Sequence, residues 1–321
     1  MSELKLRVRA SEALTPNIRT LELEAADGSA LPGFSAGAHI RVVLPDGSDR
    51  HYSLVNADTD PGATDAPDHY RLGVRLEEDS KGGSRFMHGL KAGDIIETSA
   101  PRNDFALVDA EAPVLLIAGG IGVTPLISMA AERKAKDRPF SFHYAGRSRT
   151  LLAFVDALEA IETTALTIHC DDEPETCIDL KALIGKAPAE GHIYVCGPRG
   201  MIEAVREIAH ARGIAKDHVH FELFEAHEAE AGDKSFEVEI SSTGQVFTIP
   251  PGKSIIEVLE EEGVDLIYDC QRGDCGICQT SVLSGIPDHR DVILTDDERA
   301  ANDVMQICVS RAKSDRLVLD L

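Results

Sequence analysis

Short stretches in which apolar and polar residues alternate occupy the first part of the chain. They include residues 20–25, 40–44 and 72–76, and they are separated by turn sequences such as 45–47 and 91–94. Alternation with a period of two is typical of a half-buried antiparallel strand. Strands of this kind joined by turns predict an antiparallel barrel over residues 1–107.

The pattern changes at Pro113, where uninterrupted apolar segments begin to alternate with loops and helical segments. The apolar segments are residues 114–118 and 193–195, and residues 140–144 and 166–169 are further predicted strands of this region. Such runs are typical of strands buried on both faces, and their alternation with helices indicates a parallel sheet. We therefore predict a central α/β domain over residues 108–226.

Residues 227–235 are charged or small and show no apolar periodicity, which is typical of a linker. The segment 236–321 then begins with two predicted strands, 236–240 and 245–249. A helix is predicted over 254–262, because Ser254 can cap its start and Glu257 stands three residues later. The chain thus divides into three predicted domains, in agreement with a length at which a single core usually stops growing.

Two strand-to-helix junctions of the central domain carry candidate ligand-binding residues. The strand 114–118 runs into a glycine loop with Gly120, Gly122 and Thr124, and a proline follows in the first turn of the predicted helix. Such a junction directs helix N–H groups at an anion, commonly a pyrophosphate. A tight turn without a ligand would have the same pattern. A second junction, Cys196-Gly197-Pro198, follows the strand 193–195, at the edge where ligands of parallel sheets bind.

The predicted barrel contains two further candidate segments. Alternation places Arg50 and Tyr52 on one face of a strand, so a cation and a flat ring can serve one ligand, with the Ser53 hydroxyl nearby. A surface salt bridge beside a half-buried ring would look the same. The turn Gly82-Gly83-Ser84 precedes a short helical run and is a second candidate anion site.

The cysteines give the most specific signal. Cys270, Cys275 and Cys278 follow a C-x4-C-x2-C spacing and Cys308 lies further on, which is the plant-type ligand set of a [2Fe–2S] cluster. Structural zinc usually takes two close pairs of cysteines instead. Disulfides would require an oxidising compartment, and the first residues lack the apolar region of a secretory signal. The total of seven cysteines also favours a reducing cytoplasm.

Composition restricts the possible partners. No apolar stretch is long enough to span a bilayer, so we expect a soluble protein, and we expect a monomer. The formal net charge of −23 argues against nucleic-acid binding. The segment 236–321 alone contains 17 Asp and Glu against 7 Lys and Arg. This acidity either serves solubility or attracts a basic partner protein.

The order of these motifs resembles that of a known family. Arg-x-Tyr-Ser, Gly-Gly-Ser, Gly-Gly-Ile-Gly-Val-Thr-Pro, Cys-Gly-Pro and the cysteine loop follow one another as in the phthalate dioxygenase reductase and vanillate O-demethylase reductase family. These proteins are reductase components of Rieske non-haem iron oxygenases. The resemblance covers nearly the whole chain and implies an FMN-binding barrel, an NAD-binding domain and a ferredoxin domain of the β-grasp type.

The resemblance also implies roles for individual residues. Arg50 is expected to pair with the flavin phosphate, Tyr52 to stack on the isoalloxazine and Ser53 to lie near flavin N5. Gly82, Gly83 and Ser84 match the phosphate turn; Gly120, Gly122 and Thr124 match the dinucleotide loop; Cys196, Gly197 and Pro198 match the segment beside the nicotinamide. Phe224 resembles the aromatic residue that closes the domain near the flavin, although it could instead be a core residue that anchors the linker. Ile277 stands where many relatives have threonine.

These modules together predict an electron-transfer reductase. NADH delivers two electrons as hydride and a [2Fe–2S] cluster takes one, so a flavin must stand between them. The protein would position cofactors, and we expect no catalytic acid–base pair, with His51, His88 and His143 structural. The resemblance implies FMN, because relatives with the ferredoxin module at the C-terminus usually bind it, and the barrel offers no recognisable adenosine pocket for FAD.

Cofactor and partner preference follow from weaker signals. NADH is favoured through Asp171 or Asp172, which could accept a hydrogen bond from a ribose hydroxyl, while Arg147, Ser148 and Arg149 could instead meet a 2′-phosphate. The expected partner is a Rieske-type oxygenase, in aromatic dioxygenation or O-demethylation. The alternatives are a reductase for a haem monooxygenase and a non-enzymatic iron–sulfur redox sensor.

Overall fold

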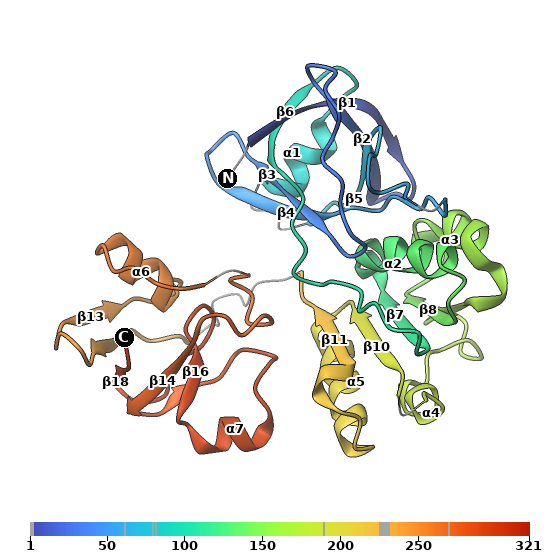
Figure 1. The fold of residues 1–321 in the computed structure, drawn as a ribbon. Helices are drawn as coiled ribbons and strands as arrows, with labels where there is room; N and C mark the ends of the chain where they lie inside the picture. Colours follow the sequence, from blue (N-terminus) through green and yellow to red (C-terminus); the bar gives the residue numbers. More distant parts are fainter. Residues whose placement is uncertain are drawn as a thin grey trace. The chain divides into compact units, whose positions relative to one another are not determined.

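The computed structural model describes residues 3–60, 62–78, 80, 82–188, 190–224, 232–268 and 270–321. The chain divides into two compact units, Met1–Glu222 and Leu223–Leu321, which are described separately below. Figure 1 shows the course of the chain through both. Within the described residues, no helix combines the length and the apolar character needed to cross a membrane.

The first unit begins with an antiparallel barrel. Its elements are β1 (Glu3–Ala13), β2 (Ile18–Ala25), β3 (His39–Val43), β4 (Asp49–Ser53), β5 (Tyr70–Arg75), α1 (Gly83–Gly89) and β6 (Ile95–Ser99). The strands lie in the order β4-β3-β6-β1-β2-β5. A bridge between Leu54 and Leu72 joins the two ends of this order and closes the barrel. The alternation in the sequence is confirmed, because Leu21, Leu23 and Ile40 face a common core.

The same unit continues with a parallel sheet. Its strands are β7 (Val114–Gly119), β8 (Phe140–Gly146), β9 (Leu166–Cys170), β10 (His192–Cys196) and β11 (Val219–Glu222), and its α-helices are α2 (Val123–Ala135), α3 (Val155–Glu162), α4 (Leu180–Gly185) and α5 (Arg199–Ala211). The order β11-β10-β7-β8-β9 reverses direction at β7, where the chain enters the sheet. Ligands of open α/β sheets bind outside the carboxyl ends of the strands at such a switch point.

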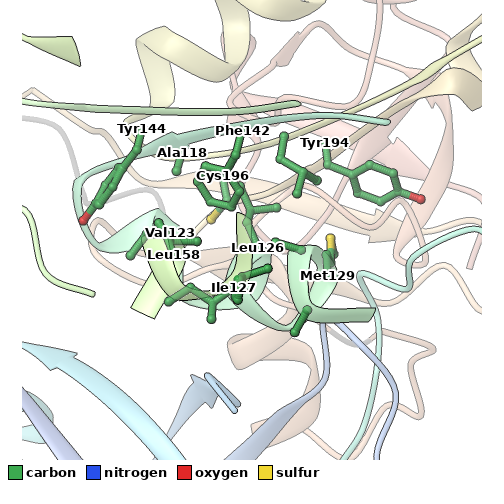
Figure 2. Close-up of a cluster of buried hydrophobic side chains, with 14 of the residues drawn as sticks. Ala118, Val123, Leu126, Ile127, Met129, Phe142, Tyr144, Leu158, Tyr194 and Cys196 are labelled. Carbon is green, nitrogen blue, oxygen red and sulfur yellow. The ribbon is translucent and has the colours of Figure 1, made fainter. Parts of the chain in front are cut away.

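A shared apolar core joins the barrel to the sheet. Figure 2 shows Val123, Leu126 and Ile127 of α2 facing the sheet residues Phe142 and Cys196. Ala36, Val55 and Phe105, which come from the barrel and the segment after it, belong to this same cluster. The Gly37 N–H also donates to Ser128 Oγ of α2 over 3.0 Å. The barrel and the parallel sheet therefore fold as one compact unit.

The second unit is a small mixed sheet with a helix packed on it. Its elements are β12 (Phe236–Ile240), β13 (Val246–Ile249), α6 (Ile255–Glu261), β14 (Gln279–Ser284), β15 (Pro287–Asp288), α7 (Asp296–Ala301), β16 (Val304–Gln306), β17 (Arg311–Ala312) and β18 (Arg316–Leu319). The sheet order is β13-β12-β18-β14-β16, with β12 parallel to β18. The predicted capping box is confirmed, since Ser254 Oγ accepts from the Glu257 N–H and the Glu257 carboxylate accepts from the Ser254 N–H. Cys278 and Cys308 lie in the core of this unit.

The end of the predicted linker 227–235 is packed into this second unit. Residues 227–231 lie outside the described residues, but Asp233, which follows them, is tightly held. Its carboxylate accepts from both terminal nitrogens of Arg290, and the two side chains are 6% and 8% exposed. Arg311 adds a second cation at 3.6 Å. A buried carboxylate between two guanidinium groups is stable because its charge is compensated on two sides.

Candidate functional site

The ends of β7 and β10 approach each other so closely that only glycine fits between them. A Cβ carbon at Gly119 would lie 2.6 Å from Pro198 Cδ, and one at Gly122 would overlap the Cys196 carbonyl. The predicted dinucleotide loop and the predicted Cys-Gly-Pro segment are thus brought together at the carboxyl edge of the sheet. Gly120, by contrast, has φ +55° and open space around it. The junction therefore offers exposed backbone where a ligand can approach.

Thr124 connects this junction to the barrel. Its hydroxyl donates to the Ile121 carbonyl over 3.0 Å, which stabilises the turn into α2. Its methyl group faces Gly73 of β5, where a Cβ would come within 2.9 Å of it. The ring of Phe154 also packs against Gly73, and Phe154 itself has φ +62°. A non-glycine residue in the left-handed region is a marker of local strain, and such strain often accompanies functional sites.

The barrel residues predicted to bind one ligand also come together. The Arg50 side chain packs on Gly83, because a Cβ there would lie 2.7 Å from Arg50 Cγ. Gly82 has φ +100° and opens the turn before α1. Tyr52 packs against the barrel core, and burial raises the pKa of its hydroxyl to about 12 although the Arg50 charge opposes this. The Tyr52 ring is therefore a neutral, flat surface beside a cation at all working pH values.

Ser53 and Ser84, the two predicted hydroxyl groups of the barrel site, differ in their surroundings. Ser53 is buried at the end of β4, opposite His39. The Ser84 hydroxyl accepts a hydrogen bond from the Glu77 N–H over 3.1 Å, so it holds the loop before α1 in place. The structure thus gives Ser84 a role in shaping this turn.

The residues considered for ribose or 2′-phosphate recognition lie on two adjoining loops. The Asp172 N–H donates to the Arg147 carbonyl over 3.1 Å, and the Asp171 N–H donates to the Gly146 carbonyl over 3.0 Å. Arg149 is paired with Glu159 of α3 at 3.4 Å. Cations and carboxylates therefore occupy the same edge beyond β8 and β9, and the geometry is compatible with either nucleotide.

In the second unit, the cysteine loop packs against the segment 291–294, a contact that the sequence did not predict. Gly273 and Gly276 have φ values of +81° and +77°, in the left-handed region that favours glycine. A Cβ at Gly273 would come within 3.0 Å of Asp291, and one at Gly276 within 2.9 Å of Ile293. The Val292 N–H donates to the Gly273 carbonyl over 3.0 Å. The segment 291–294 therefore packs closely against the loop and restricts its conformation.

The three cysteines of this loop and Cys308 suit a buried cluster of iron and sulfide. Cys270, Cys278 and Cys308 are buried and Cys275 is half-buried. The pKa of Cys270 lies far below its ordinary value because the Cys275 and Cys308 thiols donate to its sulfur. The Arg272 N–H also donates to this sulfur over 3.3 Å. Converging thiols with a backbone donor on sulfur are the donor set that a [2Fe–2S] cluster requires, so the residues present fit the group.

Asp274, which lies between Cys270 and Cys275 in the sequence, forms a hydrogen bond with Leu223, far away along the chain. Its Oδ2 accepts from the Leu223 N–H over 2.8 Å, and the Arg272 Nε lies 3.7 Å from the same oxygen. Burial raises the pKa of Asp274 to about 7, against the effect of Arg272. Leu223 is buried, whereas the neighbouring Phe224, predicted to meet the flavin, is 37% exposed. Phe224 is thus presented by a segment that is fixed to the cysteine loop.

Comparison with known proteins agrees with the predicted nucleotide-binding and iron–sulfur modules. Residues 238–313 match the 2Fe-2S iron-sulfur cluster binding domain, and residues 116–207 match the oxidoreductase NAD-binding domain. The vanillate O-demethylase oxidoreductase of Pseudomonas putida is 42% identical over 95% of this chain and 96% of its own length. The chain belongs to the phthalate dioxygenase reductase and vanillate O-demethylase reductase family.

Solved structures extend this likeness to the fold of the family. A phthalate dioxygenase reductase described as a modular structure for electron transfer from pyridine nucleotides to [2Fe-2S] is 37% identical, with a TM-score of 0.74 over 100% of this chain and 98% of that one. An intact type IV self-sufficient cytochrome P450 monooxygenase is 33% identical, with a TM-score of 0.72, over 99% of this chain and 41% of that one. The family's module order is therefore also found within a larger haem protein.

Sequence reasoning missed several residues that shape the site in this family member. Asp274 had no signal beyond its place between two cysteines. The segment 291–294 carries no recognisable motif, although Asp291 is a buried acid whose Oδ1 accepts from the N–H groups of Ile293 and Leu294. The contact of Phe154 with Gly73 depends on two segments far apart in sequence. Such contacts become visible only after the chain has folded.

Proposed function

We propose that this chain is the reductase component of a Rieske-type oxygenase system and transfers electrons from NADH through FMN and a [2Fe–2S] cluster to the oxygenase. The observation that supports this proposal is the likeness, over nearly the full length, to a vanillate O-demethylase oxidoreductase and a phthalate dioxygenase reductase. The chain is an NAD(P)H-dependent oxidoreductase, so the hypothesis of a non-enzymatic sensor is not retained.

Each module has a separate task in this proposal. We assign FMN to the barrel (1–107), NADH to the parallel sheet (108–226) and the cluster to residues 236–321. When bound, the flavin accepts two electrons as hydride and releases them singly, which connects a two-electron donor to a one-electron cluster. The protein contributes binding and orientation.

The barrel residues would hold FMN. Arg50, which lies against Gly83, supplies a cation for the phosphate, and the open turn at Gly82 and Gly83 leaves backbone N–H groups available beside it. Tyr52 supplies a neutral ring for stacking, and Ser53 is a hydrogen-bonding hydroxyl on the same strand. Ser84 supports this site by fixing the turn through the Glu77 N–H.

The sheet residues would hold NADH. Gly120 and Gly122 lack side chains, so the dinucleotide could approach the backbone closely at this loop, opposite Cys196 and Gly197. Thr124 stabilises the loop through its hydrogen bond to Ile121. Pro198 packs against Gly119 at the same junction. Asp171 or Asp172 would favour NADH over NADPH because a carboxylate accepts from a ribose hydroxyl and repels a 2′-phosphate.

The thiolates of Cys270, Cys275, Cys278 and Cys308 would bind the cluster. Burial of the first, third and fourth excludes water, while half-buried Cys275 lies nearest to solvent. A reductase for a haem monooxygenase is the second candidate function, because the same modules occur at 33% identity in a self-sufficient cytochrome P450.

Three measurements test this proposal. Flavin released from the purified protein and identified by mass should be FMN, and recovery of FAD would contradict the barrel assignment. Oxidation should be faster with NADH than with NADPH at equal concentration. Protein reduced with NADH should bleach the visible absorption of a Rieske-type oxygenase, whereas exclusive reduction of a cytochrome P450 would favour the second candidate.

A further inference from the structure

Asp274 occupies a position where a buried carboxylate is costly. Its side chain is 5% exposed and stands within the loop that carries the cluster cysteines. A carboxylate buried in this way has lost its contact with water and therefore needs hydrogen-bond donors from the protein. A residue in such a place requires a compensating contact.

The compensating contact is made to a segment far away in sequence. Asp274 Oδ2 accepts the Leu223 N–H over 2.8 Å, across 51 positions of sequence. Leu223 is 1% exposed, so its N–H has no access to water and depends on this acceptor. Arg272 Nε, 3.7 Å from the same oxygen, reduces the cost of the negative charge. The contact is thus a charge-assisted hydrogen bond in a buried place.

We infer that Asp274 is a positioning residue for electron transfer between the flavin and the cluster, because it fixes the segment Leu223–Phe224 to the cluster loop. The inference rests on the proposed function and on the role that the family resemblance implies for Phe224, which places this residue near the flavin. Fixing residue 223 also fixes the backbone that presents Phe224. The segment that carries Phe224 is therefore joined to the cysteine loop within the second unit.

A second contact of this part of the chain strengthens this inference. Asp233, near the end of the predicted linker, is held by Arg290 and Arg311 in the same unit, so the chain is anchored to that unit at Leu223 and again at Asp233. The Leu223 anchor depends on a single carboxylate, whereas the Asp233 anchor has two cations. Removing Asp274 should therefore release Leu223 and Phe224 while the fold of the unit persists.

Hydrogen exchange of the Leu223 amide in the oxidised, full-length holoenzyme tests the contact without any turnover. Asp274→Ala should accelerate this exchange by about ten- to hundredfold, because a hydrogen bond to a charged group is lost. Asp274→Asn keeps an acceptor oxygen and should retain most of the protection. Ser254→Ala is the matched control, because it removes the cap of α6 in the same unit and does not touch Leu223. Unchanged exchange in Asp274→Ala would overturn the inference.

Stopped-flow reduction by NADH then measures the consequence. In Asp274→Ala the step from flavin to cluster should slow by about tenfold or more, as misplacement of reacting groups predicts. NADH-to-ferricyanide activity, which draws on the flavin, should match the wild type. Asp274→Asn should restore the transfer rate, and Ser254→Ala should leave it unchanged.

Two further results would overturn the positioning role. If Asp274→Asn slowed transfer as much as Asp274→Ala and shifted the cluster midpoint potential equally, the charge would matter and not the anchor. If Ser254→Ala slowed transfer equally, general destabilisation would be the cause. Should Asp274→Ala fail to assemble the cluster, Asp274→Asn decides, because loss of Leu223 protection or of the transfer rate in that variant would overturn the positioning role. A purified wild-type protein that contains no flavin or no cluster would refute the proposed function. The exchange result would still report on the contact between Asp274 and Leu223, because it does not depend on turnover.

Discussion

Gly122 lies so close to Cys196 that a Cβ carbon at position 122 would come within 2.2 Å of the Cys196 carbonyl oxygen. The φ of Gly122 is −61°, an ordinary helical value, so the requirement for glycine comes from space and not from backbone strain. Both contact partners are main chain, which cannot rotate away. This contact sets the distance between the ends of β7 and β10, where NADH is proposed to bind.

Gly122→Ala should therefore damage both stability and nucleotide binding. Overpacking against a fixed backbone costs about 1–3 kcal/mol, and the widened junction should raise the KM for NADH. Urea unfolding and steady-state kinetics measure the two effects. Gly200→Ala is the control, because Gly200 lies in α5 with open space around it and alanine there should stabilise the helix by up to about 1 kcal/mol. Equal behaviour of the two variants would show that the contact does not matter.

Cys275→Ser should separate the two electron acceptors. Loss of one thiolate should abolish the visible iron–sulfur absorption and the reduction of cytochrome c, because the cluster is no longer held. NADH-to-ferricyanide activity should largely survive, since ferricyanide can take electrons directly from the flavin. Loss of both activities in a folded protein that retains its flavin would contradict the order in which the flavin precedes the cluster.

Arg50→Ala should weaken FMN binding. A charge-assisted contact with a phosphate contributes about 1.5–3 kcal/mol, which corresponds to about a ten- to hundredfold higher Kd. Fluorescence titration of the flavin-free protein measures this. Arg9→Ala, in the same barrel, removes an exposed cation that pairs with Asp68 and should leave the Kd unchanged. Full retention of FMN by Arg50→Ala would mean that Arg50 is an ordinary surface cation.

Two histidine pairs should make the first unit sensitive to acid. His143 Nδ1 lies 3.0 Å from His169 Nε2, and His220 Nε2 lies 3.1 Å from His192 Nδ1. Burial, followed by the neighbouring histidines, lowers the pKa of His143 and of His220 to about 4. The unfolded value is about 6.5, so the unfolded chain binds more protons between these limits. The free energy of unfolding should be highest above about pH 6.5 and fall as the pH drops towards about 4.

Urea unfolding at a series of pH values between these limits measures this dependence. His220→Gln removes one of the depressed groups and should make the dependence shallower. His210→Gln, at an exposed position of α5, serves as the control and should follow the wild type. A wild-type stability that is flat across this window would refute the role of the pairs.

Salt should slow delivery of electrons to the oxygenase. The segment 236–321 carries 17 acidic against 7 basic residues, and the Debye length falls from about 10 Å at 0.1 M salt to about 3 Å at 1 M. If the oxygenase surface is basic, stopped-flow transfer from the cluster should slow with added salt. Reduction of ferricyanide, a small anion, should slow less or become faster. Transfer rates that do not change with ionic strength would show that the acidity serves solubility alone.

The sequence by itself determined the modules and their order. Alternation in the barrel, buried runs before Gly120 and Cys196, and the spacing of Cys270, Cys275 and Cys278 are local patterns, each imposed by neighbouring residues. The capping box at Ser254 was predictable for the same reason, because donor and acceptor are three residues apart. Local chemistry of this kind is readable without knowing how the chain folds.

Only the tertiary structure decided which of these segments meet. The packing of Arg50 on Gly83, the closure of Gly122 on Cys196 and the hold of Asp274 on Leu223 join positions that are distant along the chain. No periodicity marks such pairs, because their geometry depends on strand register and on the shared core that joins the barrel to α2. Asp274 shows the difference most clearly, since its place among the cysteines was visible in the sequence, while its partner was selected by the fold.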